Sequence, residues 1–252
     1  MKVIINADDC GKDRHTDEHI VKIINAGKLT STTIMANMPD VEYAKQMFDT
    51  YKDTVSFGCH LNLTEGYPLL NQEILLSAGV CRVDPQGTMV LDWNRSRNMP
   101  LSKNVRDAVY NELDAQITKL EEMGVTISHL DSHHHIHTAP CLMGVVAALS
   151  KKHNIYKVRR IRNFIPFGIS YISRDVWYLM SKMNNMSYTM TDYFCSYSEY
   201  MKNPSLHKFK NTHSIELMVH PGHSKQSSIE EERSLLEDDF PDCFELINYN
   251  QL

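Results

Sequence analysis

Short strand-like runs alternate with helical patterns along most of the chain, and this alternation constrains the fold more than any other feature. The strand-like runs are residues 2–7, 31–37, 55–63, 126–131, 157–161 and 214–220. The helical patterns are residues 16–27, 41–51, 102–123, 139–153, 174–183 and 228–240. Because strand–helix–strand units with right-handed crossovers build parallel sheets, the sequence predicts an α/β fold, either doubly wound or closed into a barrel.

The helix in residues 102–123 is the clearest of these predictions. Its apolar residues recur on one face, namely Val105, Val109, Leu113, Ile117 and Leu120. Ser102 is expected to cap this helix and Gly124 to end it, and Asp40 is expected to cap the helix in residues 41–51. Ser228 and Glu231 have the spacing of a capping box for the last helix.

Length and composition favour one domain over residues 1–252. A (β/α) barrel typically takes about 250 residues, and a composition of 42% hydrophobic and 23% charged residues is ordinary for a globular chain. The net charge of -5 argues against a nucleic-acid partner, which would require a basic face. No apolar run is long enough for a membrane span or a signal peptide, and the six cysteines include no C-x-x-C pair. We therefore expect a cytoplasmic protein without a membrane partner.

Residues 66–100 interrupt the alternation. Within them, residues 84–87 read Asp-Pro-Gln-Gly, which predicts a hairpin turn. We interpret this segment as an inserted excursion over the strand ends, which is either a lid or a surface insertion.

Unusual polar residues follow the predicted strands at their carboxyl ends. They are Asp8, Asp9, His60, Asn62, residues 131–137, Arg159, Arg162 and His220. Because the carboxyl ends of parallel strands meet at one rim, where ligands bind, we expect these side chains to converge.

Each cluster also has a structural explanation. Asp8 and Asp9 could be a helix cap with a solvated neighbour, and either His60 or His220 alone could be an ordinary core histidine. Residues 128–140 could be an unstructured metal-scavenging tract, although ordered core patterns flank them. If the chain is extended there, residues alternate between two sides. The period of two then places Asp131, His133, His135 and His137 on one side, with Ser132 and His134 on the other.

One Asp and two His from three strands would form a three-ligand site for a divalent metal with open positions for water. Such a metal lowers the pKa of its bound water and polarises a substrate carbonyl. A neighbouring carboxylate could then take the water proton, and a separate His could protonate the leaving group. The sequence contains no G-x-S-x-G, Walker A, H-E-x-x-H or G-x-G-x-x-G motif.

Six motifs, in order, resemble those of the YdjC-like carbohydrate deacetylases, the family of chitooligosaccharide deacetylase. They are NADDCG (6–11), TSTTIMAN (30–37), GCHLNLT (58–64), HLDSHHHIH (129–137), VRRIRN (158–163) and MVHPGH (218–223). The resemblance implies a deformed (β/α) barrel, similar to glycoside hydrolase and deacetylase barrels. It also implies a metal-dependent hydrolase that removes acetyl groups from N-acetylated sugars such as chitobiose. Cys10 stands where the family motif has phenylalanine.

By position, the resemblance makes Asp9, His60 and His133 the metal ligands and Asp8 the base. The family implies Mg²⁺, while two His and one Asp would also suit Zn²⁺.

The remaining polar residues have supporting roles in this hypothesis. His220 is expected to protonate the departing amine, and Arg159 or Arg162 to orient Asp8. Asp131 is expected to orient an imidazole. We expect metal-bound water or sugar hydroxyls to contact Asn62, His135 and His137. His134 is expected to point into the packing behind the site. The metal ligand from this tract could also be His135 or His137 in place of His133.

Two other functions stay open from the sequence. A metal-dependent phosphoesterase would also use Asp and His at a barrel rim, but such sites usually recruit several metals and more basic side chains. A non-catalytic sugar-binding regulator would have no need of a base and an acid. In each reading the partner is a small sugar or its derivative, and a homodimer is expected only because dimers are the commonest assemblies.

Overall fold

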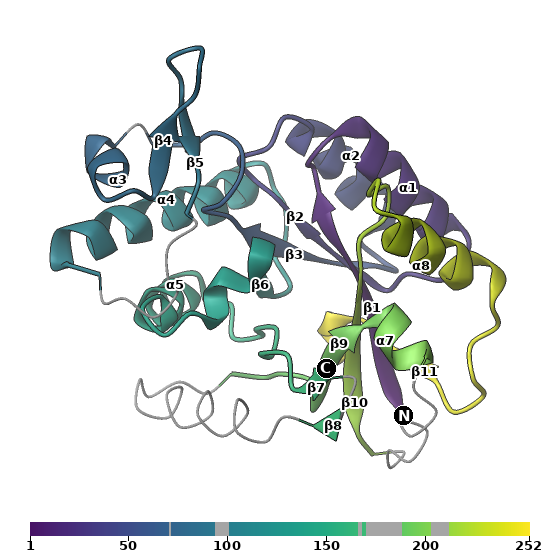
Figure 1. Ribbon diagram of the computed structural model, residues 1–252. Coiled ribbons are helices and arrows are strands. Elements are labelled where there is room, and N and C mark those ends of the chain that lie inside the picture. Colours follow the sequence, from purple (N-terminus) through teal and green to yellow (C-terminus); the bar gives the residue numbers. More distant parts are fainter. Residues whose placement is uncertain (71, 94–100, 166–167, 170–187, 203–211) are drawn as a thin grey trace.

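A parallel sheet of seven strands forms the centre of the computed structural model, which describes residues 1–70, 72–93, 101–165, 168–169, 188–202 and 212–252 (Figure 1). The strand order is β6-β3-β2-β1-β10-β9, and β11 also pairs with β1. The seven strands are β1 (Lys2–Cys10), β2 (Ser31–Ile34), β3 (Ser56–Leu61), β6 (Leu130–Ser132), β9 (Tyr193–Ser196), β10 (Ser214–Val219) and β11 (Glu245–Leu246).

Isolated bridges extend the sheet beyond β6. Leu130 pairs with Val158 and Lys157 pairs with Thr189, so the curled sheet continues toward the segment that carries β9. This curled, half-barrel sheet confirms the predicted α/β fold of the deformed-barrel type. Two predicted strands are much shorter than expected. In residues 126–131 only the start of β6 forms, and in residues 157–161 only the isolated bridges of Lys157 and Val158 form.

Helices surround the sheet on two sides. In Figure 1, α1, α2 and α8 lie together on one side of the molecule, and α4 and α5 on the other. The longer helices are α1 (Arg14–Asn25), α2 (Val41–Tyr51), α4 (Lys103–Glu122), α5 (Met143–His153) and α8 (Gln226–Glu237). Four residues of the predicted face of α4 are buried, Val109, Leu113, Ile117 and Leu120, and Val105 packs at its edge. The helix expected in residues 174–183 lies outside the described residues.

Asp40 and Ser102 stand at the predicted cap positions of α2 and α4, but neither side chain makes a cap bond. Asp40 binds the guanidinium of Arg14 at 2.9 and 3.0 Å. The capping box of α8 is wrong as well: the helix begins at Gln226, and Glu231 accepts the backbone N–H of Ser198.

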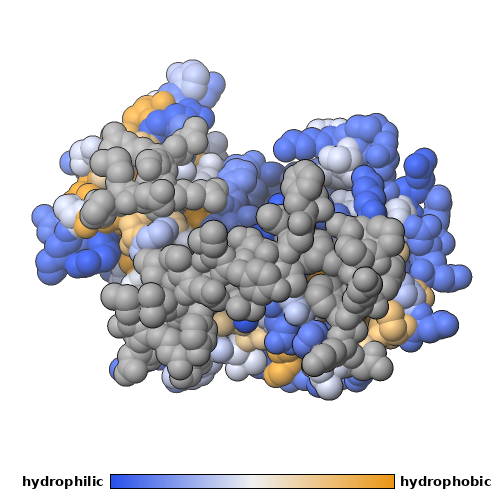
Figure 2. Space-filling view, turned by 60° about the horizontal axis from the view of Figure 1, so that its bottom comes forward, coloured by the Kyte–Doolittle hydropathy of each residue, from blue (hydrophilic) through white to orange (hydrophobic). Residues whose placement is uncertain are grey.

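The excursion in residues 66–100 contains α3 (Glu73–Ser77) and an antiparallel hairpin of β4 (Cys81–Val83) and β5 (Met89–Leu91). The predicted turn is confirmed, because the N–H of Gly87 donates to the carbonyl of Asp84 at 3.0 Å. The N–H of Trp93 donates to the carbonyl of Leu63, which anchors the excursion beside the end of β3. In Figure 2 a notch separates the hairpin, at the upper left, from the right-hand side of the molecule. A lid role stays a prediction.

Short elements complete the described fold. They are η1 (His133–Thr138), β7 (Phe164–Ile165), β8 (Gly168–Ile169), α7 (Tyr197–Met201) and η3 (Tyr249–Gln251). Among the described helices, none has the length and apolar character needed to cross a membrane. That residues 1–252 form one domain stays a prediction.

Candidate metal site and its supporting network

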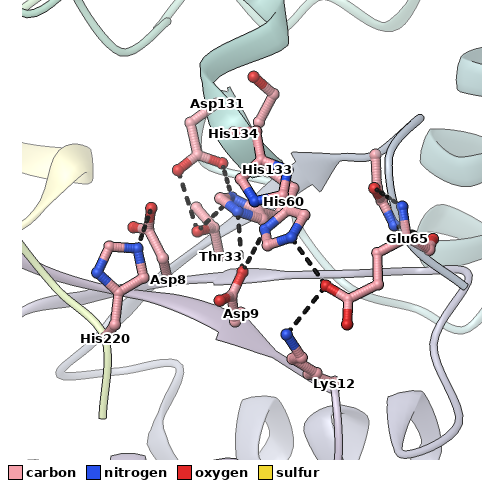
Figure 3. A network of polar contacts seen from close by, with 12 residues as sticks. Asp8, Asp9, Lys12, Thr33, His60, Glu65, Asp131, His133, His134 and His220 are labelled. Carbon is pink, nitrogen blue, oxygen red and sulfur yellow. Dashed lines mark hydrogen bonds and ion pairs between the residues drawn. The ribbon is translucent and has the colours of Figure 1, made fainter. Parts of the chain in front are cut away.

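A β-bulge near the end of β1 presents both aspartates to one polar cluster (Figure 3). β1 pairs with β2 at Ala7↔Thr32 and then at Cys10↔Ile34, so Asp8 and Asp9 together lie opposite one residue of β2. Asp9 has a φ of 68°, in the left-handed region. Neighbouring residues of a regular strand point to opposite faces, and a bulge redirects one of them. The bulge therefore explains how two adjacent carboxylates reach the same site.

Asp9, His60 and His133 come together as the sequence predicts. Asp9 Oδ1 lies 3.3 Å from His60 Nε2 and 2.8 Å from His133 Nδ1. All three residues are buried, and one ligand-type atom from each lies within 4.8 Å of the others. Apart from these two imidazole nitrogens, no group among the described residues is recorded as a partner of Asp9 Oδ1. A buried carboxylate oxygen between two imidazole nitrogens is a donor set that fits a divalent cation.

Each of the two imidazoles has a carboxylate on its other nitrogen. His60 Nδ1 lies 2.7 Å from Asp131 Oδ1, and His133 Nε2 lies 2.9 Å from Glu65 Oε2. Carboxylates in this position fix the tautomer and orientation of a metal-binding histidine. The placement of Asp131 agrees with the sequence prediction. Glu65 is not among the predicted site residues, because it lies in the loop after β3, where no periodic pattern marks it.

The charged neighbours shift the pKa values of these groups. Burial opposes protonation of His60, but Asp131 and Asp9 overcome it and raise the pKa of His60 to about 10. The hydrogen bond from His133, against the opposing effect of burial, lowers the pKa of Glu65 to about 2. Both imidazoles therefore have carboxylate surroundings that favour a positive charge, whether a proton or a metal ion supplies it.

A second cluster centres on the fully buried Arg159. Its guanidinium donates to both oxygens of Asp8 at 2.7 and 2.8 Å, lies 2.8 Å from Asp131 Oδ2, and donates to Glu216 Oε1 at 2.8 Å. Burial alone would raise the pKa of Asp8, but Arg159 holds it well below its ordinary value. Burial raises the pKa of Glu216 to about 7 although Arg159 acts against it. The hydroxyl of Tyr249 donates to Glu216 Oε2 at 2.5 Å.

Two histidines after β10 flank the pair of aspartates. His220 Nε2 lies 4.0 Å from Asp8 Oδ2, as expected for a group that acts next to Asp8, and burial lowers the pKa of His220. His223 Nε2 lies 2.9 Å from Asp9 Oδ2. His223 lies in the motif MVHPGH, and no role is predicted for it from the sequence.

The period-two arrangement expected for the histidine tract is wrong. Residues 133–138 form η1, in which His134 and His135 have positive φ values of 51° and 55°. His133 alone of these histidines belongs to the candidate metal group. His137 is buried away from it, with its ring nitrogens at 2.5 Å from Ser132 Oγ and 3.2 Å from the carbonyl of Arg159.

The two histidines between them also differ from expectation. His134 does not point into the packing: it is exposed, and its Nδ1 lies 2.9 Å from the hydroxyl of Thr64. His135 packs its ring edge-on against Phe194, with centroids 5.5 Å apart.

Three further residues have structural contacts. Asn62 holds the loop that carries Glu65: its amide donates to the carbonyl of Glu65 at 2.7 Å, and its side-chain oxygen accepts the N–H of Thr64. Arg162 pairs with Glu199, so of the two arginines it is Arg159 that contacts Asp8. Cys10 is buried in the main apolar core.

Comparison with known proteins agrees with this geometry. Residues 2–245 match the family described as YdjC-like protein. A Vibrio cholerae protein named carbohydrate deacetylase is 37% identical over 158 residues, which cover 62% of this chain and 57% of that protein. The match thus spans less than two thirds of that relative's length. A Clostridium beijerinckii protein of the same name is 30% identical over 229 residues, covering 88% of this chain and 82% of the relative.

A solved structure shows the same fold. It is an Enterococcus faecalis protein described as a cellobiose-phosphate cleavage protein, with a TM-score of 0.76 and 23% identity over 99% of this chain and 98% of that one. The match of the family model along nearly the whole chain settles the classification, and the chain belongs to the YdjC-like protein family.

Proposed function

We propose that this protein is a metal-dependent hydrolase that removes the N-acetyl group from an acetylated amino sugar or a short, chitobiose-like oligosaccharide. The observation that carries the proposal is the buried group of Asp9, His60 and His133 with Asp8 and His220 beside it. The relatives named carbohydrate deacetylase support the choice of substrate class. A divalent ion held by these three residues would polarise the acetamide carbonyl and acidify a water molecule.

The chain's own groups then handle the protons. Asp8 is ionised at neutral pH because Arg159 holds its pKa low, so it can accept the proton of the attacking water. His220, 4.0 Å away, would protonate the amine as the C–N bond breaks. The products are acetate and the free amino sugar. Arg159 keeps both oxygens of Asp8 in place during the transfer.

The donor set bears on which metal is bound. Magnesium prefers oxygen ligands. A set of two imidazoles and one carboxylate suits zinc and related ions. The family resemblance favours Mg²⁺ and the ligand chemistry favours Zn²⁺, so both belong in the test.

Arg159 argues against the phosphoesterase alternative. Asp8, His60 and Asp131 form a second group of ligand-type atoms, as a two-metal phosphoesterase would need. The guanidinium of Arg159 already lies 2.7 Å from Asp8 and 2.8 Å from Asp131. With that position filled by a permanent cation, a single-metal amide hydrolase fits better.

The test is acetate release from N,N'-diacetylchitobiose by the purified protein with Mg²⁺, Zn²⁺ and other divalent ions. We expect metal-dependent acetate, lost in Asp8→Asn while metal binding is kept. Phosphate release from a phosphosugar, with no acetate from any N-acetyl sugar, would overturn the proposal. Sugar binding without turnover in any metal would favour the regulator.

A further inference from the structure

Three histidines line a cavity of about 550 Å³ between α1 and α8, which lie side by side in Figure 1. His15 and His19 belong to α1, and His223 follows β10. A Cβ atom at Gly222 would lie 3.0 Å from Thr16 Cα and 3.4 Å from His15 Cδ2, so the turn that carries His223 packs directly against the first turn of α1. Imidazoles from two parts of the chain therefore meet at one cavity.

His15 and His19 have the spacing of a metal-binding pair. They are four residues apart on α1, and their ring centroids lie 4.5 Å apart. Residues at positions i and i+4 share one face of a helix, so both rings can reach the same ion. Imidazole nitrogens suit zinc, nickel and copper ions, whereas magnesium prefers oxygen ligands. The pair therefore favours a transition-metal ion.

Two of the three imidazoles have a carboxylate on one ring nitrogen. His19 Nδ1 lies 2.7 and 2.9 Å from the two oxygens of Glu232, and His223 Nε2 lies 2.9 Å from Asp9 Oδ2. A neutral imidazole that donates its N–H to a carboxylate keeps a lone pair on its other nitrogen. His19 Nε2 and His223 Nδ1 are then the nitrogens that can bind an ion. Carboxylates in this position orient the histidines of metal sites.

The charges around the cavity balance and do not oppose a cation. Lys22 and Arg233 line it, and so do the carboxylates of Glu232 and Glu237. Lys22 Nζ lies 3.9 Å from Glu232 Oε1, but the side chain of Lys22 is 62% exposed and can turn into solvent.

The three imidazoles are more widely spaced than the candidate metal group described above. They are not among the sets of described residues whose ligand atoms all lie within 4.8 Å of one another. Because His15 is exposed, its ring can turn between staggered rotamers toward His19 and His223 when an ion binds.

We propose that His15, His19 and His223 bind a divalent transition-metal ion, of the class of Zn²⁺ and Ni²⁺, at a second site in this cavity. Three imidazoles leave one tetrahedral position open for water. Glu232 is a positioning residue, because it contacts His19 and is not one of the three ligands. The second site does not rest on the proposed function, since a metal can bind here whether or not the protein is a hydrolase.

The experiment is titration calorimetry with Zn²⁺ and Ni²⁺ on His133→Ala protein, at a pH above about 7, where an ordinary imidazole is neutral. His133→Ala removes a ligand of the candidate metal site and leaves the contact between Asp9 and His223 in place. His15→Ala, His19→Ala and His223→Gln are then added singly. His153→Ala is the matched control, because it removes an imidazole of α5 whose two nitrogens already face Glu121 and Asp114.

We expect His133→Ala protein to keep a zinc site that excess Mg²⁺ does not displace. Each of the three cavity variants should lower its affinity by more than about 100-fold, and Glu232→Gln by roughly 10- to 100-fold, as for a residue that supports a ligand. His153→Ala should leave the affinity unchanged.

Two results would overturn the second site. One is the absence of zinc and nickel binding in His133→Ala protein. The other is an affinity in any of the three cavity variants equal to that in His153→Ala. His15→Gln repeats the test at an exposed position, where loss of the imidazole leaves the packing of α1 intact.

Discussion

Two acidic clusters meet at the rim of this sheet, and they differ in what neutralises them. The cluster of Asp8, Asp131 and Glu216 surrounds the guanidinium of Arg159, which stays protonated at any physiological pH. Among the described residues, Asp9 has only imidazoles as charged neighbours, from His60, His133 and His223.

The protein therefore separates a permanent cation from groups that can exchange a proton for a metal ion. An imidazole can give up its proton and use the freed nitrogen as a metal ligand, whereas a guanidinium cannot. The Arg159 cluster is therefore satisfied without any ligand, and the Asp9 cluster is not.

The largest effect is expected from Asp9→Asn. The substitution keeps one oxygen but removes the charge that attracts a cation between His60 and His133. Affinity for a divalent ion should fall by more than the roughly 10- to 100-fold typical of losing a residue that only supports a ligand. Metal titration with calorimetry measures this, and Asp53→Asn, an exposed carboxylate in the loop after α2, is the control. Unchanged affinity in Asp9→Asn would move the metal away from this cluster.

Arg159→Met should cost about 3–5 kcal/mol of unfolding free energy, because it leaves buried carboxylates without their cation. The comparison is Arg162→Met, whose partner Glu199 is partly exposed and whose loss should cost about 1 kcal/mol or less. Urea denaturation measures both.

If Arg159 occupies the place of a second metal, added divalent ions should restore more stability to Arg159→Met than to Arg162→Met. Equal restoration would contradict that role.

The alternation of strands and helices predicts that Asp9, His60 and the histidine tract lie near one another, because parallel strands bring their carboxyl ends together regardless of sequence distance. Periodicity leaves open which histidine of the tract would bind metal, and the choice of His133 rests on the resemblance to the YdjC-like family. The pattern also leaves open whether Arg159 or Arg162 contacts Asp8, and in the structure Arg159 does.

The histidine tract failed for a physical reason. A period of two holds only while the backbone is extended, and two consecutive left-handed residues, His134 and His135, end that condition. A run of identical residues carries no signal for such a turn. Glu65 and His223 lie in the loops after β3 and β10, where neither helical nor strand periodicity applies, so no pattern in the sequence marks them. The missing cap bonds of Asp40 and Glu231 have another cause, because their side chains bind Arg14 and the backbone of Ser198, which belong to other elements.

A smaller effect is expected in the pH dependence of stability through Glu216. Its pKa is about 7 in the folded protein against an ordinary value of 4.5, so the folded state binds a proton that the unfolded state lacks between these values. Stability from this group is present below about pH 4.5 and is lost as pH rises through about 7. Glu216→Gln should remove that loss, on the order of 1–3 kcal/mol between pH 5 and 8. Urea denaturation at several pH values checks it, and an unchanged slope would show that Glu216 is ionised throughout.

The smallest effect separates the two carboxylates that support the imidazoles. Asp131 is fully buried and also contacts Arg159. The side chain of Glu65 is 39% exposed, so water screens its contact with His133. Asp131→Asn should therefore weaken metal binding by about 10- to 100-fold, and Glu65→Gln by about 10-fold or less.

Lys12→Met is the control for Glu65→Gln, because Lys12 binds the same carboxylate at 3.0 Å but is not one of the candidate metal ligands. If Glu65 acts on His133 directly, Lys12→Met should change metal affinity less than Glu65→Gln does. Equal losses in the two variants would mean that the Lys12–Glu65 pair orders the loop as a unit. Glu65 would then support the metal site through the loop backbone that Asn62 holds, and only the buried carboxylate would orient its imidazole directly.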